Sequence, residues 1–180
     1  FLTDWAGAPK SLVRRHYAGE DTLPLHDPFP VHENDRFLPR ARLVSGAVVV
    51  DDDAAALAAL RSPRFDRETM AVLASGSPHP PATSPAGTAT IAADTPDYLR
   101  IEIAPAVPGW LVLADSFYPG WRASVDGVER EIVRANIAFR AVEVRPGDRV
   151  VEFKYRPLSF RGGLALSAAA AVGLAMVGLI

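Results

Sequence analysis

Residues 115–157, DSFYPGWRASVDGVEREIVRANIAFRAVEVRPGDRVVEFKYRP, decide the fold expected for this 180-residue chain. Apolar and polar residues alternate there in short runs separated by turn residues. Val151, Phe153 and Tyr155, for example, alternate with Glu152 and Lys154, which is the pattern of a strand with one buried and one solvated face. Several such runs in succession predict antiparallel β-structure.

The same pattern continues upstream of this stretch. Leu99, Ile101 and Ile103 alternate with polar residues, whereas 110–114 is apolar on both faces and predicts a central strand. Asp126-Gly127 is a hairpin signal, and Pro146-Gly147 marks another turn. The full set of predicted strands is 45–50, 69–74, 88–93, 98–104, 110–115, 121–125, 131–134, 139–144 and 150–155. The seven strands after residue 87 predict a sandwich-like antiparallel domain.

The first half of the chain is less regular. Residues 1–42 are polar and interrupted by prolines, so we expect an extended segment. Asp51, Asp52 and Asp53 precede an Ala/Leu run at 54–60, which predicts a short helix with an acidic N-terminal cap. The sequence SGSPHPPATSPAG at 75–87 contains four prolines and predicts a linker or loop.

Residues 162–180 form an apolar tail without a charged side chain. A helix of these 19 residues would span roughly 28 Å, close to the hydrocarbon thickness of a bilayer. The tail therefore predicts a C-terminal transmembrane helix, with a buried core helix as the alternative. The expected organisation is an extended and small α/β portion at 1–74, a linker or loop at 75–87, a sandwich-like domain at 88–157 and the transmembrane helix at 162–180.

Composition excludes some classes of function. The formal net charge of −2 and the scattered Lys and Arg residues argue against a nucleic-acid partner. The chain has no cysteine, so it offers neither disulfides nor thiolate metal sites. It begins at Phe1 without the pattern of a signal peptide, and we expect it to be a fragment of a longer protein.

Several ordered motifs resemble the C-terminal region of the bacterial YfhO-type membrane proteins. They cover most of the chain and include Asn34, Leu38–Ala41, Arg61–Pro63, Tyr118–Arg122, Val125–Gly127, Arg134–Asn136, Phe139-Arg140, Pro146-Gly147, Val151–Phe153, Tyr155–Pro157 and Ser159-Phe160. That family is similar to integral-membrane glycosyltransferases of the GT-C type, which use lipid-linked sugars. The resemblance implies an extracytoplasmic β-domain that follows many transmembrane helices and precedes a closing one.

The resemblance also implies partners and a location. The expected partners are membrane lipid, a lipid-linked sugar or envelope glycan, and the transmembrane helices of the parent protein. Arg149, Lys154, Arg156 and Arg161 precede the tail, and positive charge beside a span is typical of the cytoplasmic side. Along a strand at the bilayer surface, these residues could instead face anionic lipid headgroups. We follow the resemblance and expect the domain on the outer side of the cell membrane.

One candidate binding site surrounds the Pro119-Gly120 turn. The aromatic rings of Phe117, Tyr118 and Trp121 could offer a flat platform to a sugar while Arg122 or Asn136 supplies hydrogen bonds. The predicted binding residues are Tyr118, Trp121, Arg122 and Asn136. The alternative is that Trp121 fills the core and the turn only shapes the bend. We predict that replacement of Trp121 by Ala separates the two readings.

The remaining polar motifs give no catalytic prediction. The acidic run at 51–53 contains an Asp-x-Asp pattern of the kind that binds a metal–sugar phosphate, but its place before a helix favours a cap. The histidines lack metal-ligand spacing. We therefore expect no catalytic residue, no metal and no cofactor in this chain.

The predicted function is an accessory domain of a YfhO-like cell-envelope glycosyltransferase whose catalytic part lies on the missing helices. The alternative is a non-enzymatic carbohydrate-binding or structural module anchored at the membrane.

Overall fold

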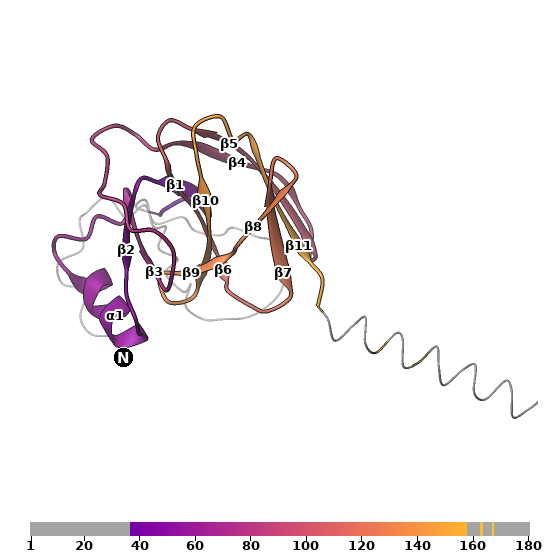
Figure 1. The fold of residues 1–180 in the computed structure, drawn as a ribbon, viewed down its shortest axis with the longest axis horizontal. Helices are drawn as coiled ribbons and strands as arrows, with labels where there is room; N and C mark the ends of the chain where they lie inside the picture. Colours follow the sequence, from indigo (N-terminus) through magenta and orange to yellow (C-terminus); the bar gives the residue numbers. More distant parts are fainter. Residues whose placement is uncertain (1–36, 158–162, 164–166, 168–180) are drawn as a thin grey trace, which may run out of the picture. The chain divides into compact units, whose positions relative to one another are not determined.

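The computed structural model describes residues 37–157, Gly163 and Ser167. The described part is mainly β, with two sheets and one short helix, as the sequence predicts (Figure 1). The predicted transmembrane helix at 162–180 lies outside the described residues apart from Gly163 and Ser167, and most of the predicted extended segment also lies outside them. Within 37–157, no helix has the length and apolar character needed to cross a membrane.

The six-stranded sheet has the order β1-β6-β10-β9-β3-β2, and the five-stranded sheet has the order β4-β5-β11-β7-β8. All pairings are antiparallel except β2 with β3, which the helix α1 connects as a crossover. The elements are β1 (Ala41–Val44), β2 (Gly46–Val49), α1 (Asp53–Arg61), β3 (Met70–Leu73), β4 (Gly87–Asp94), β5 (Tyr98–Pro105), β6 (Gly109–Ser116), β7 (Trp121–Val125), β8 (Val128–Arg130), β9 (Val133–Ala135), β10 (Phe139–Val144) and β11 (Val150–Tyr155).

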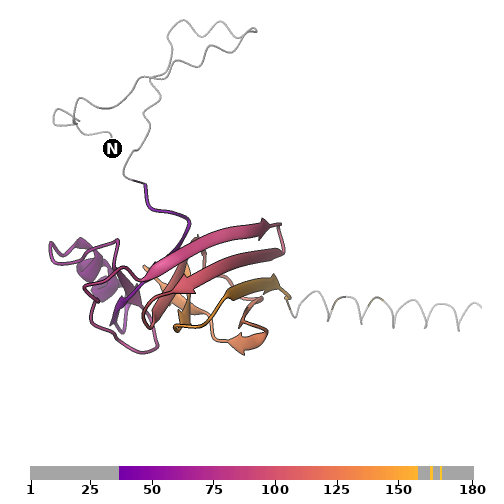
Figure 2. The same ribbon diagram turned by 90° about the horizontal axis from the view of Figure 1, so that it is seen from above.

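A shared hydrophobic core holds the two sheets together. Figure 2 shows β4 and β5 as two long adjacent strands of the five-stranded sheet. Leu99, Ile101 and Phe153 face inward from this sheet, as their alternation predicts. Leu111 and Val142 belong to the same cluster and come from the six-stranded sheet. The burial of large side chains from both sheets is the main stabilising contribution to their packing.

The six-stranded sheet curls because its two outer strands are almost continuous in sequence. Only Ser45 separates β1 from β2, which lie at opposite edges of the sheet. Five inter-strand steps in a flat sheet would span about 24 Å, far beyond the reach of one residue at about 3.5 Å. The sheet therefore bends back until the β1–β2 junction passes close to Gly109 at the start of β6.

The curl encloses a second core cluster that includes Trp110, Leu73 and Ala135. Residues 74–86, which include most of the predicted linker or loop at 75–87, connect β3 to β4 and are held against the six-stranded sheet. His79 exchanges backbone hydrogen bonds with Ala47, and the amide of Ala82 donates to Ser45 Oγ at 3.0 Å. These bonds compensate for the small apolar surface that the proline-rich loop can bury.

The acidic run at 51–53 caps α1. The Asp52 side chain accepts a hydrogen bond from the Ala55 amide at 2.7 Å, and Asp53 forms an ion pair with Arg134 at 2.7 Å. The first contact satisfies one of the amides that a helix N-terminus leaves without a partner. The prediction of a cap is confirmed.

Most strand predictions after residue 87 are confirmed within two residues. β7, β10 and β11 have the predicted bounds, and the apolar run at 110–114 lies in β6, between β1 and β10. The strand predicted at 131–134 corresponds to β9, which begins at Val133 and ends at Ala135, whereas β8 was not predicted. β1 was not predicted, since its four residues are flanked by polar and turn-forming sequence.

The junction gives the first testable prediction. A Cβ atom at Gly109 would lie 2.2 Å from the Val44 carbonyl oxygen, so Gly109→Ala must displace the backbone. We expect a loss of about 1–3 kcal/mol in the free energy of unfolding. Urea denaturation of the 180-residue chain measures it. Ala104→Ser is the control, since it adds one atom at an exposed position of β5.

Candidate functional site

The predicted sugar-binding turn forms one wall of a surface groove. The turn joins β6 of one sheet to β7 of the other, and Gly120 has a φ of 102°. Its carbonyl accepts a hydrogen bond from the Arg156 amide at 2.7 Å, which ties the turn to the residues after β11. We call the resulting depression the exit groove, because Tyr155, Arg156 and Pro157, at the end of the described range 37–157, line it. Its volume is about 480 Å³, and it is lined by Tyr118, Pro119, Gly120, Trp121, Arg122, Tyr155, Arg156 and Pro157.

Three of the four predicted binding residues lie in this groove. Tyr118 is 62% exposed and makes the most accessible ring of the turn, and Trp121 and Arg122 also line the groove. Arg122 forms an exposed ion pair with Glu129 at 3.1 Å. Such a pair contributes little stability and leaves the guanidinium with further donors for a ligand.

Asn136 lies elsewhere, between β9 and β10 of the six-stranded sheet. Its side-chain oxygen accepts a hydrogen bond from the Val72 amide at 2.9 Å, and its own amide donates to the Val72 carbonyl at 2.7 Å. These bonds tie the β9–β10 turn to β3, where ladder pairing is limited to Leu73 with Ala135. Asn136 has a structural role here, and it does not line the exit groove.

Trp121 packs against the shared core and also lines the exit groove. The ring is partly buried against the shared core, and the guanidinium of Arg140 lies 4.2 Å from the ring centroid. The Tyr155 ring is tilted by 46° with its centroid 5.3 Å away. Since Arg140 covers one face of the indole, Trp121 forms a wall of the groove and leaves Tyr118 as the ring best exposed for stacking.

A second depression also has Trp121 in its lining and is bordered by residues of both sheets. We call it the mouth groove. Its volume is about 410 Å³, and it is lined by Arg40, Asp94, Thr95, Pro96, Leu99, Asp115 and Trp121. The residues come from both sheets, and the turn after β4 is fixed by hydrogen bonds between Thr95 and Tyr98.

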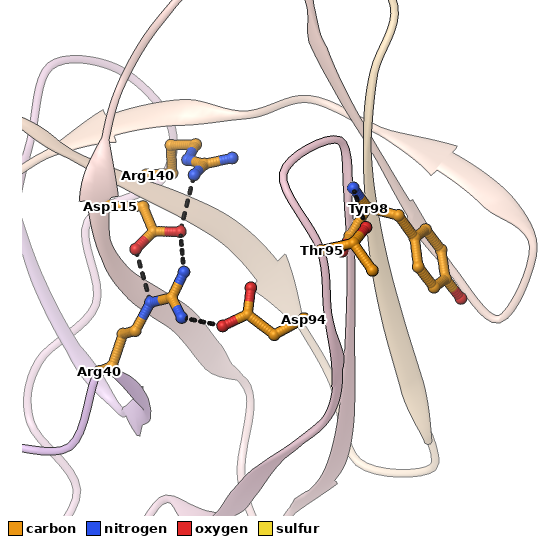
Figure 3. A network of polar contacts seen from close by, with 6 residues as sticks. All are labelled: Arg40, Asp94, Thr95, Tyr98, Asp115 and Arg140. Carbon is orange, nitrogen blue, oxygen red and sulfur yellow. Dashed lines mark hydrogen bonds and ion pairs between the residues drawn. The ribbon is translucent and has the colours of Figure 1, made fainter.

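A chain of ion pairs crosses the mouth groove (Figure 3). Arg40 binds Asp115 in a bidentate manner, at 2.7 Å and 2.9 Å, and also binds Asp94. Arg140 donates from Nη2 to the same Asp115 carboxylate at 2.8 Å. Hydrogen bonds to Asp115 and Asp94 raise the pKa of Arg40, so it stays protonated under all ordinary conditions.

Arg140 is the most unusual residue of this network. In β10, Arg140 lies on the same buried face of the strand as Val142 and Val144, and its side chain is only 4% exposed. Burial lowers the pKa of Arg140. Among the described residues, its Nε and Nη1 have no hydrogen-bond partner. The rings of Trp121 and Phe153, at 4.2 Å and 5.4 Å from the guanidinium carbon, partly compensate the buried charge.

Sequence reasoning missed Arg40, Asp94, Asp115 and Arg140 as parts of a site. One signal was available, since a charged residue stands at an inward position of the alternating run FRAVEV at 139–144. The partners were not readable, because Arg40 lies 54 residues from Asp94 and 75 from Asp115. The described residues contain no group of three or more acidic or histidine side chains that could hold a metal ion.

Comparisons with protein-family models, curated proteins and solved structures find no match to this chain.

The buried charge gives a second prediction. Asp115→Asn removes the carboxylate that compensates Arg140, and we expect a loss of about 3 kcal/mol in the free energy of unfolding. The double variant Asp115→Asn/Arg140→Met removes both charges and should recover most of that loss, because Met fills a similar volume. Urea denaturation of the 180-residue chain measures both. Equal stability of the single and double variants would contradict this account of Arg140.

Proposed function

We propose that the chain is the extracytoplasmic accessory domain of a YfhO-like polytopic membrane protein, a cell-envelope glycosyltransferase that uses lipid-linked sugar. In this proposal the domain holds a sugar, as part of the donor or the acceptor, close to the membrane. Transfer itself takes place on the part of the parent protein that this chain lacks. The isolated chain should therefore bind sugar without catalysing transfer.

The observation that carries the proposal is the composition and place of the exit groove. Three of its lining residues, Tyr118, Trp121 and Tyr155, are aromatic, and Arg122 and Arg156 add two guanidinium groups. Flat rings offer apolar contact to the C–H face of a sugar, and guanidinium groups donate hydrogen bonds to its hydroxyls or to a linked phosphate.

The groove's place along the chain supports the membrane part of the proposal. Tyr155, Arg156 and Pro157 line the groove and are followed in sequence, after four more residues, by the apolar tail at 162–180. If the tail spans the membrane, a ligand in the groove lies only a few residues from the lipid surface. This place suits a lipid-linked sugar, and membrane lipid and the parent's helices are the further proposed partners.

Sugar binding gives the third prediction. We expect the 180-residue chain, kept in a mild detergent, to bind cellotriose, whose equatorial hydroxyls leave flat apolar ring faces. Tyr118→Ala should weaken binding by about 1 kcal/mol, or roughly fivefold in Kd, through loss of ring contact. Isothermal titration calorimetry measures Kd, and thermal melting checks that the fold is unchanged.

Phe117→Ala is the matched control, because Phe117 belongs to the same turn and is 41% exposed but does not line the groove. Equal Kd values for the wild type and both variants would exclude the exit groove as the binding site. Trp121→Ala is a poorer test, since Trp121 also packs against the shared core and Arg140. It should lower the melting temperature as well as sugar binding.

The alternative function, a non-enzymatic carbohydrate-binding or structural module anchored at the membrane, would use the same groove. The coding sequence upstream of Phe1 distinguishes the two, and this is the fourth prediction. We expect many apolar spans in the same frame, with acidic residues in an early outward loop. A start codon or signal peptide directly before Phe1 would instead favour the module.

A further inference from the structure

Trp121 is the only residue shared by the linings of the exit groove and the mouth groove. The two depressions therefore adjoin each other across one side chain, although their other walls come from different segments. Their volumes, about 480 Å³ and 410 Å³, are similar. A ligand that fills the first groove and is longer than one unit would meet the second on the far side of the indole.

The charge of the mouth groove indicates the class of ligand that it suits. Arg40, Asp94 and Asp115 line the groove, and the buried Arg140, which does not line it, pairs with Asp115. The two positive and two negative charges of this network are neutral in sum. A neutral site gives no net attraction to a free anion or cation. A polyol fits both kinds of group, because its hydroxyls can donate to carboxylates and accept from a guanidinium.

The network also has hydrogen-bonding capacity to spare. The Asp94 side chain is 47% exposed, and only its Oδ2 has a partner among the described residues, which leaves Oδ1 open. Arg40 is 43% exposed in its side chain. Pro96, Leu99 and Trp121 provide apolar surface between these polar groups. Apolar walls with a few fixed polar groups are typical of small-molecule sites.

We propose that the mouth groove is a second sugar subsite, continuous with the exit groove through Trp121, and that the surface binds a neutral oligosaccharide of at least two units. This inference rests on the proposed function, since it takes the exit groove as the first subsite. Arg40 and Asp94 bind hydroxyls of the second unit. Asp115 is a positioning residue, because its carboxylate holds both Arg40 and Arg140.

The test compares glucose, cellobiose and cellotriose as probes on the 180-residue chain. Occupation of two linked subsites should make cellobiose and cellotriose bind at least about tenfold more tightly than glucose. Asp94→Ala should remove most of this advantage and leave the Kd for glucose unchanged. The variant should fold, since Arg40 keeps its bidentate bonds to Asp115 and the lost ion pair is exposed.

Glu102→Ala is the matched control, because Glu102 is an exposed acidic residue of β5 that lines neither groove. It should leave all three Kd values unchanged. Equal binding of glucose and cellotriose by the wild type, or equal Kd values for Asp94→Ala and Glu102→Ala, would overturn the second subsite and leave the exit groove standing. Absence of binding for every probe would overturn the proposed function and this inference together.

Discussion

The pairing of Arg140 with Asp115 is the constraint on which the candidate site depends. A guanidinium stands where the neighbouring inward positions of β10 carry valines, so its charge must be compensated inside the domain. Asp115 supplies the negative charge and also binds Arg40, which in turn binds Asp94. The rings of Trp121 and Phe153 add further compensation. One buried charge thereby fixes the polar groups of the mouth groove and the indole between the two grooves.

The backbone places these side chains through a second constraint, the single-residue junction at Ser45. β1 pairs with β6 and β2 pairs with β3, and because only Ser45 separates β1 from β2, these two edges of the sheet must meet. Arg40 directly precedes β1, and Asp115 lies near the end of β6, so the β1–β6 register brings the two together. At the other end of the β1–β6 pair, Gly109 has no Cβ and therefore lets the Val44 carbonyl lie close to it. A residue with a Cβ at this position would have to displace the backbone of β1.

Local signals in the sequence predicted the strands but not their partners. β10 and β11 were predictable because each follows an alternating pattern with a clear turn beside it. The strand–helix–strand order of β2, α1 and β3 is typical of a parallel pair, but no local pattern shows that β3 pairs with β9 or that β1 lies at the opposite edge of the same sheet. The site divides in the same way. A local pattern could group Tyr118, Trp121 and Arg122, which are near in sequence and share the exit groove. Asn136 is instead hydrogen-bonded to β3. The ion pairs of the mouth groove join residues from distant segments, so no local pattern predicted them.

The hydrogen bond from the Arg156 amide to the Gly120 carbonyl has a mechanical consequence. The chain continues beyond Pro157, and any tension applied there reaches Arg156 before it reaches the ladder of β11. The bond then passes that load to the turn that connects the two sheets. A pull on Arg156 would thus reach the turn between the two sheets through this hydrogen bond before it reaches the β11 ladder.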